Sequence, residues 1–231
     1  MALARQSDCP ARSAFSPYPL GQGLLEDLCD YEFPTRVSAW NSAVLSLDSG
    51  GTHFGFVYSG APTLCFASGK FPLSPGMYFS VPGAMSIQKG SGIAISRLSY
   101  HGFFHLGGPI EDRGRLRYID GCTDSLIVPP VMRGDACLNL LHFPPHTQQT
   151  PHTHPSIRVG VVVRGGGTCV TPARQIALTP GLAFVIRAGS LHSFHTQDSE
   201  LLVIAYHPDS DFGPTHENHP MINRTILQTQ K

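Results

Sequence analysis

An internal repeat constrains the fold of this chain more than any other feature of its sequence. The segment that starts at His53, HFGFVYSGAPTLCFASGKFPLSPGMYFSVPGAMSI, resembles the segment that starts at Arg158, RVGVVVRGGGTCVTPARQIALTPGLAFVIRAGSLHSF. Matched glycines such as Gly55 and Gly160 are 105 residues apart, and the same offset holds across most of the match. A repeat of this size predicts that one supersecondary unit occurs twice in the fold.

Each copy has the pattern of a series of short strands. An apolar, β-rich run (FGFVY or VGVVV) is followed by glycine-containing turns, an L-[ST]-P-G sequence and a second β-rich run (MYFSV or LAFVI). Strands of about six residues with turns roughly every 8–12 residues are typical of a sandwich or barrel. Helical periodicity is weak except in GLLEDLCDYEF at residues 23–33. The sequence therefore predicts an all-β fold with a short N-terminal helix.

The repeat also indicates how the chain divides. Residues 1–36 precede the first copy, and we expect them to form an arm and a helix that pack on the first lobe. The polar, glycine-rich connector GGPIEDRGRLRYIDG, residues 107–121, separates the two copies. We therefore expect a first lobe at residues 37–112 and a second lobe at residues 113–231.

Charge and hydropathy narrow the class of partner. The 231-residue chain has 16 basic and 16 acidic residues and no basic stripe or helix-turn-helix segment, so we expect a small-molecule partner and neither nucleic acid nor a membrane. No run of about 18 apolar residues occurs, and the N-terminus lacks an apolar run of signal-peptide length, which predicts a cytoplasmic protein. The six cysteines form no CxxC pair, and we expect most of them to be reduced.

Three histidines in the second copy have the spacing of a metal site. His152 and His154 lie two residues apart in PHTHPS, so on a strand both imidazoles point to the same side, about 7 Å apart along the backbone. His192 follows from the next hairpin but one. Three imidazoles from neighbouring strands suffice for a facial metal site with open coordination positions.

The first copy lacks these ligands. The 105-residue offset places Leu47, Ser49 and Ile87 where the second copy has its three histidines, and none of these side chains replaces an imidazole. We therefore expect the first lobe to bind no metal at this site.

These residues carry a resemblance to the cupin superfamily, whose two motifs are G-x5-H-x-H-x3-E-x6-G and G-x5-P-x-G-x2-H-x3-N. The first motif is matched at His152, His154 and Gly165, with His146 at its first glycine and Arg158 at its glutamate. The second is matched at Gly181, Gly189 and His192, with Arg187 at its proline and Thr196 at its asparagine. The resemblance implies two tandem cupin lobes (jelly-roll or β-barrel), a bicupin whose first lobe is degenerate and whose second has the three-histidine site known from several cupin dioxygenases.

Two questions about this site stay open in the sequence. The usual glutamate ligand is absent, since a guanidinium offers no lone pair, and Gln149, His146 and His195 are alternative fourth ligands near in sequence. Arg158 either faces the cavity, where it pairs with an anionic substrate, or lies outside it or against a buried acid.

The tail YHPDSDFGPTHENHPMINRT, residues 206–225, also allows two interpretations. Its segment 207–224 is either a lid over the barrel or a loop that caps the sheet through Asx turns, and we favour the structural role. After one inserted residue, Tyr100 and His101 align with Tyr206 and His207, which predicts a structural role shared by the two histidines.

The function that we expect follows largely from the resemblance. It implies one divalent metal ion, with Fe(II) favoured over Zn, Ni or Mn, and a non-haem oxygenase or dioxygenase that uses dioxygen and a small anionic substrate. The alternatives are a cupin isomerase, lyase or hydrolase with a Lewis-acid metal, and a non-enzymatic sensor or binding protein. We expect a monomer or a homodimer.

Overall fold

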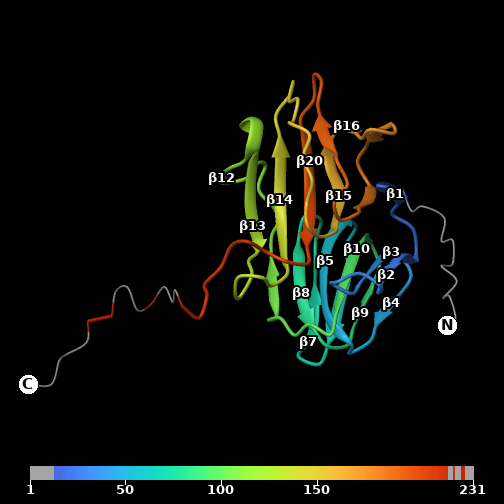
Figure 1. Ribbon diagram of the computed structural model, residues 1–231. Helices are drawn as coiled ribbons and strands as arrows, with labels where there is room; N and C mark the ends of the chain where they lie inside the picture. Colours follow the sequence, from blue (N-terminus) through green and yellow to red (C-terminus); the bar gives the residue numbers. More distant parts are fainter. Residues whose placement is uncertain (1–12, 218–220, 222–224, 227–231) are drawn as a thin grey trace, which may run out of the picture.

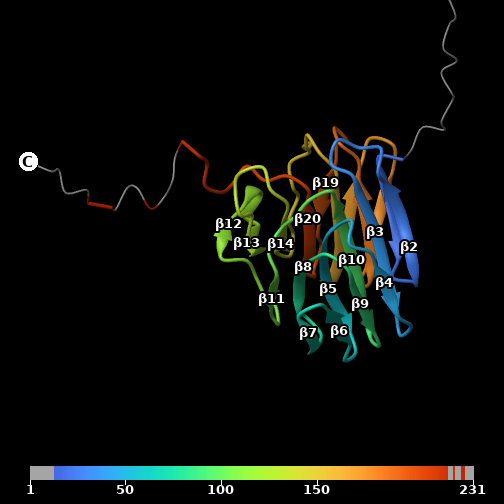
Figure 2. The same cartoon turned by 90° about the horizontal axis from the view of Figure 1, so that it is seen from below.

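Strands make up almost all the regular structure of the computed structural model, which describes residues 13–217, 221, 225 and 226 (Figures 1 and 2). Within that part of the chain the helical element is a single 3-10 turn, Ile119–Gly121. No described helix has the length and apolar character needed to cross a membrane. The predicted all-β class is confirmed, while residues 1–12 of the predicted arm and parts of the 207–224 loop lie outside the described residues.

The second half of the chain, joined by one strand from the N-terminal segment, forms two sheets that enclose a barrel (upper half of Figure 1). The larger sheet has the strand order β1, β18, β15, β20, β14, β13, β12, and the smaller has the order β17, β16, β19. The bounds of the larger sheet are β1 Phe15–Pro19, β18 Leu182–Ile186, β15 Arg158–Gly165, β20 Leu201–His207, β14 Cys137–Phe143, β13 Thr123–Val128 and β12 Leu116–Arg117. Those of the smaller sheet are β17 Gln175–Leu178, β16 Gly167–Val170 and β19 Ser193–His195.

The first half has a similar pair of sheets (lower half of Figure 1). Its larger sheet has the order β11, β8, β5, β10, β3, β2, and its smaller sheet the order β4, β9, β6, β7. The bounds of the larger sheet are β11 His105–Gly107, β8 Tyr78–Pro82, β5 Gly51–Ser59, β10 Ser91–Leu98, β3 Thr35–Asn41 and β2 Gly23–Leu28. Those of the smaller sheet are β4 Leu45–Leu47, β9 Met85–Gln88, β6 Thr63–Phe66 and β7 Gly69–Pro72.

An apolar layer joins the two larger sheets. One buried cluster contains side chains from both of them, including Phe54, Phe56 and Ile95 of the first sheet and Leu138, Leu140 and Ile204 of the second. Successive side chains of a strand point to opposite faces, so the other residues of β14, β15 and β20 face the interior of the second barrel. This alternation decides which polar residues reach that interior.

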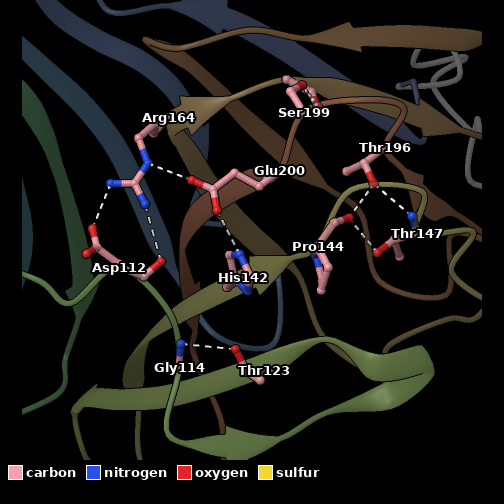
Figure 3. A network of polar contacts seen from close by, with 11 residues as sticks. Asp112, Gly114, Thr123, His142, Pro144, Thr147, Arg164, Thr196, Ser199 and Glu200 are labelled. Atoms are coloured by element: carbon pink, nitrogen blue, oxygen red, sulfur yellow. Dashed lines mark hydrogen bonds and ion pairs between the residues drawn. The ribbon is translucent and has the colours of Figure 1, made fainter.

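The polar connector between the halves is fixed to the second one. Arg164 of β15 donates hydrogen bonds to Glu200 (2.8 Å) and to Asp112 (3.0 Å), and the Glu200 carboxylate pairs with Nε2 of His142 at 3.0 Å (Figure 3). Apart from β1, the strands up to Gly107 belong to the first pair of sheets, and the strands from Leu116 belong to the second. This membership supports our proposed lobe boundary near residue 112.

The N-terminal segment differs from the prediction in two ways. The predicted helix at residues 23–33 is wrong, because β2 occupies Gly23–Leu28 and pairs antiparallel with β3. Pairing with a sheet edge and burial of Leu28 override a weak local helical pattern. The arm also does not pack on the first lobe alone, because β1 pairs with β18 of the second lobe and the ring of Phe15 stacks on Phe184 at 5.0 Å.

Each larger sheet contains a glycine that accommodates a phenyl ring from the adjacent strand. A Cβ atom at Gly55 would lie 2.1 Å from Cζ of Phe79, and one at Gly160 would lie 2.3 Å from Cζ of Phe184. Both glycines and both phenylalanines are related by the 105-residue offset. The repeated glycines are therefore explained by close packing, since the rings occupy the space that any side chain would need.

We predict that Gly160→Ala lowers the free energy of unfolding by about 1–3 kcal/mol, because the methyl group displaces the Phe184 ring in a closely packed interior. Urea denaturation followed by circular dichroism measures the change. Replacing Phe184 by Leu in the Gly160→Ala background is expected to recover part of the loss.

Gly166→Ala is the matched control, because its Cβ would meet nothing closer than an oxygen atom of Leu178 at 3.5 Å. A Gly160→Ala variant with the unfolding midpoint of the wild type would contradict the packing account.

Candidate metal centre

Three imidazoles meet at one end of the second barrel. His152 and His192 lie opposite each other in an antiparallel bridge, in which each backbone N–H donates to the other residue's carbonyl oxygen at 2.9 and 3.0 Å. The ring centroids of the trio are 4.6–5.2 Å apart, and one ligand atom from each residue lies within 4.8 Å of the other two. In the described part of the chain this is the one group of three or more His, Cys, Asp or Glu with such an arrangement.

Hydrogen bonds fix the orientation of two of these rings. Nδ1 of His152 donates to the carbonyl oxygen of Thr150 at 2.9 Å, and Nδ1 of His192 donates to that of Ser190 at 2.9 Å. A carbonyl oxygen can only accept, so the proton of each neutral ring lies on Nδ1. Both Nε2 atoms therefore keep a lone pair, as metal-ligating histidines with a hydrogen-bonded second nitrogen do.

The loops that carry the ligands are tied together by backbone and hydroxyl contacts. The N–H of Gly189 donates to the carbonyl oxygen of His154 at 2.8 Å, and Gly189 has a φ of 70°, a conformation that favours glycine. The Thr196 hydroxyl accepts from the N–H of Thr147 at 2.9 Å and donates to Pro144 at 2.6 Å (Figure 3). Thr196, at the position where the motif has asparagine, thus connects the segment before His152 to the segment after His192.

Burial keeps the site neutral. Burial lowers the pKa of His154 to about 3, and the charges of Arg158, His192 and His152 add to this effect. Burial also lowers the pKa of His192 to about 4, against the opposing hydrogen bond to Ser190. Both rings are therefore neutral at pH 7, the protonation state that binds a cation.

The histidines line a cavity with apolar walls and a few polar groups. Phe143, Phe184 and Phe194 form much of the wall. The polar or titratable lining residues besides the trio are Tyr118, Gln149, Arg158 and His207. An apolar cavity with a few convergent polar groups is typical of a small-molecule site.

Arg158 combines the two alternatives that the sequence left open. Its side chain lines the cavity and also pairs with the Asp209 carboxylate, with 3.3 Å between Nη1 and Oδ1. Nη1 also donates to Ser156 and to the carbonyl oxygen of Ile157, while the Ser156 hydroxyl donates to Asp209. The segment after β20 therefore positions Arg158, which gives part of the 207–224 loop a structural role at the cavity.

Of the three alternative fourth ligands, only Gln149 lines the cavity. Its Oε1 accepts a hydrogen bond from the N–H of Phe194 at 3.1 Å. His146 is exposed on the surface, 4.0 Å from Asp198, and His195 contacts the Ser193 hydroxyl at 3.0 Å.

His207 is the residue that the sequence comparison misplaced. His101 is exposed and follows the end of β10, whereas His207 belongs to β20 and lines the cavity. Phe54 lies opposite Ile95 in the β5–β10 pair, and Val159, the equivalent of Phe54, lies opposite Tyr206 in the β15–β20 pair. Tyr206 therefore corresponds to Ile95 and not to Tyr100. The predicted shared role of the two histidines is therefore wrong, and the alternation of LLVIAYH was the feature that could have indicated an inward-facing His207.

The corresponding end of the first barrel is apolar. Ile87 faces Leu45 in the β4–β9 pair, and Leu47 faces Met85, so the register differs by two residues from the one that the 105-residue offset implies. All four side chains belong to or pack against the apolar core of this barrel. In the described residues the first barrel has no group of metal-ligating side chains.

Arg187, which stands at the motif's proline, links the metal loops to the N-terminal segment. It forms an ion pair with Glu26 of β2, and each side chain is 10% exposed. The Tyr18 hydroxyl donates to the same carboxylate at 2.7 Å. The first lobe therefore contacts the second directly before the loop that carries His192.

Comparisons with known proteins agree with this architecture. The family model described as "Cupin domain" matches residues 139–208, and comparison with curated proteins gives no match. A putative glyoxylate induced protein from Pseudomonas aeruginosa has a TM-score of 0.61 at 13% identity, covering 93% of this chain and 95% of its own. Protein Ylba from E. coli has a TM-score of 0.59 at 17% identity, covering 92% and 89%.

Similar solved structures also include an enzyme. A salicylate 1,2-dioxygenase variant from Pseudoaminobacter salicylatoxidans, in complex with gentisate, has a TM-score of 0.59 at 11% identity and covers 75% of this chain and 68% of its own. At these identities the likeness concerns the fold. The chain has the cupin fold and carries a cupin domain over residues 139–208.

Proposed function

We propose that the protein is a mononuclear metal-dependent bicupin enzyme, with Fe(II) as the favoured ion and oxygenation of a small anionic organic molecule as its reaction. The observation that carries this proposal is the trio His152, His154 and His192, whose ligand atoms lie within 4.8 Å of one another. The salicylate dioxygenase among the similar structures, described as a complex with gentisate, supports the reaction class and the substrate charge.

The donor set fits a divalent ion. Nε2 of His152 and of His192 is free to ligate because Nδ1 is hydrogen-bonded, and His154 is held in its neutral form by burial. Three neutral ligands leave positions for substrate and dioxygen, and a bound iron(II) ion would supply the redox chemistry between them.

The chain's own residues would bind and orient the substrate. Arg158 lines the cavity with a permanent positive charge, which favours an anionic group, although burial lowers the pKa of its guanidinium. The phenyl rings of Phe143, Phe184 and Phe194 exclude bulk water from the same space.

We predict that His152→Ala and His192→Ala each lower the bound metal at least about tenfold from near one ion per chain, because removal of a ligand is costlier than removal of its hydrogen-bond partner. Elemental analysis of protein purified without chelator measures this. His195→Ala is the matched control, because His195 lies three residues from His192 but does not line the cavity.

The identity of the metal separates the alternatives. Iron together with oxygen consumption supports an oxygenase, whereas zinc, nickel or manganese without it supports Lewis-acid chemistry. A wild-type chain that takes up no metal would contradict the proposal and would leave a binding or structural cupin.

The lowered pKa values also predict a pH dependence of stability in the metal-free protein. Below pH about 6.5 the unfolded chain binds protons at His154 and His192, whereas the folded chain does not until pH about 4. The free energy of unfolding should therefore fall by roughly 1–3 kcal/mol between pH 7.5 and 5.5. Urea denaturation at both pH values measures it.

A His154→Gln/His192→Gln double variant should lose the share of the decrease that these two rings cause, and the share from His53 and His207, whose pKa values burial also lowers, should remain. A variant of the exposed His101 should keep the full decrease. A double variant with the full decrease would show that other groups cause the pH dependence.

A further inference from the structure

The cavity has a second polar end beyond the three histidines. His207 lies past His154, with 6.4 Å between their ring centroids, whereas the centroids of the trio are 4.6–5.2 Å apart. His207 is also outside the group whose ligand atoms lie within 4.8 Å of one another. It therefore lines the same cavity without belonging to the metal ligands.

The Asn139 amide lies against both ring nitrogens of His207. Nδ2 of Asn139 lies 3.3 Å from Nδ1 and 3.4 Å from Nε2 of the imidazole. An amide N–H donates, so the ring nitrogen that accepts it carries no proton. A ring that accepts this hydrogen bond carries its N–H on the other nitrogen.

Arg158 leaves donors unused at the same end. Within the described chain its hydrogen bonds to Ser156, Ile157 and Asp209 all start from Nη1, and Nε is buried with no partner. A buried N–H without a partner destabilises the folded protein, and an acceptor in the cavity would remove that destabilisation. The Asp209 carboxylate contacts the positive guanidinium at Nη1 only. The edge formed by Nε and Nη2 has no acceptor among the described residues and can donate to an anion.

We propose that His207 and Arg158 together form a carboxylate-binding subsite beside the metal ligands, on the side of His154, so that His207 is a substrate-contacting residue. This inference rests on the proposed function and defines its substrate class. The substrate is a carboxylic acid whose metal-binding oxygen atoms lie several bonds away from its carboxylate. The carboxylate accepts hydrogen bonds from the His207 N–H and from the unused donors of Arg158, which match a planar two-oxygen group.

A pair of matched ligands tests this subsite on the cobalt-loaded full-length chain. 3,4-Dihydroxybenzoate has a catechol end for the metal and a carboxylate at the far end, while 3,4-dihydroxybenzamide is its neutral isostere. Titration followed by the visible absorption of cobalt reports both the metal contact and the dissociation constant. We expect the wild type to bind the carboxylate at least about tenfold more tightly than the amide.

Variants then assign the preference to residues. His207→Phe and Arg158→Met should bind both compounds equally while keeping the cobalt spectrum of the free protein, and His207→Gln, which retains an N–H donor, should keep part of the preference. The exposed His101→Phe is the control and should behave as the wild type. A wild type without preference, or a His207→Phe variant with the full preference, would overturn the inference.

The test distinguishes failure of this inference from failure of the proposed function. A chain that takes up no cobalt contradicts the metal site. The carboxylate subsite does not require the metal. Calorimetric titration of the metal-free wild type and of His207→Phe with the same two compounds therefore tests it separately. Loss of carboxylate preference in His207→Phe supports it, and equal binding by both proteins contradicts it.

Discussion

The apolar layer between the two larger sheets is the constraint on which the rest of the structure depends. Leu138 and Leu140 of β14 and Ile204 of β20 point into this layer and are almost fully buried. Because side chains alternate along a strand, the intervening Asn139 and the terminal His207 must then face the interior of the second barrel. Packing on one face of the sheet thus positions polar groups on the other.

The two barrels share this framework but differ in what fills them. The glycine and phenylalanine pairs at residues 55 and 79 and at residues 160 and 184 repeat the same ring packing in both. The first barrel is then closed by large apolar side chains such as Trp40 and Ile87. The second keeps histidines at the corresponding end, so the difference between the lobes lies in a few side chains on a common backbone plan.

Patterns in the sequence were sufficient for the all-β class and for bringing the three histidines together. Strand alternation depends on residues close in sequence, and the repeat shows which strands of the two copies correspond. The predicted helix at 23–33 failed because β2 is stabilised by pairing with β3 and by the Glu26–Arg187 ion pair, which joins distant segments. His207 was misplaced because the alignment of the copies paired Tyr206 with Tyr100, whereas strand pairing makes Tyr206 equivalent to Ile95. Register between strands is a tertiary property.

The central claim is that one metal ion is held in the second barrel by three imidazoles. Anomalous X-ray diffraction from crystals of the metal-loaded protein tests it most directly, because the peak locates the ion independently of any assay. The account predicts one strong peak within about 2.0–2.2 Å of a nitrogen atom from each of His152, His154 and His192, and none in the first barrel. A peak elsewhere, or full occupancy without one of these histidines as a ligand, would contradict it.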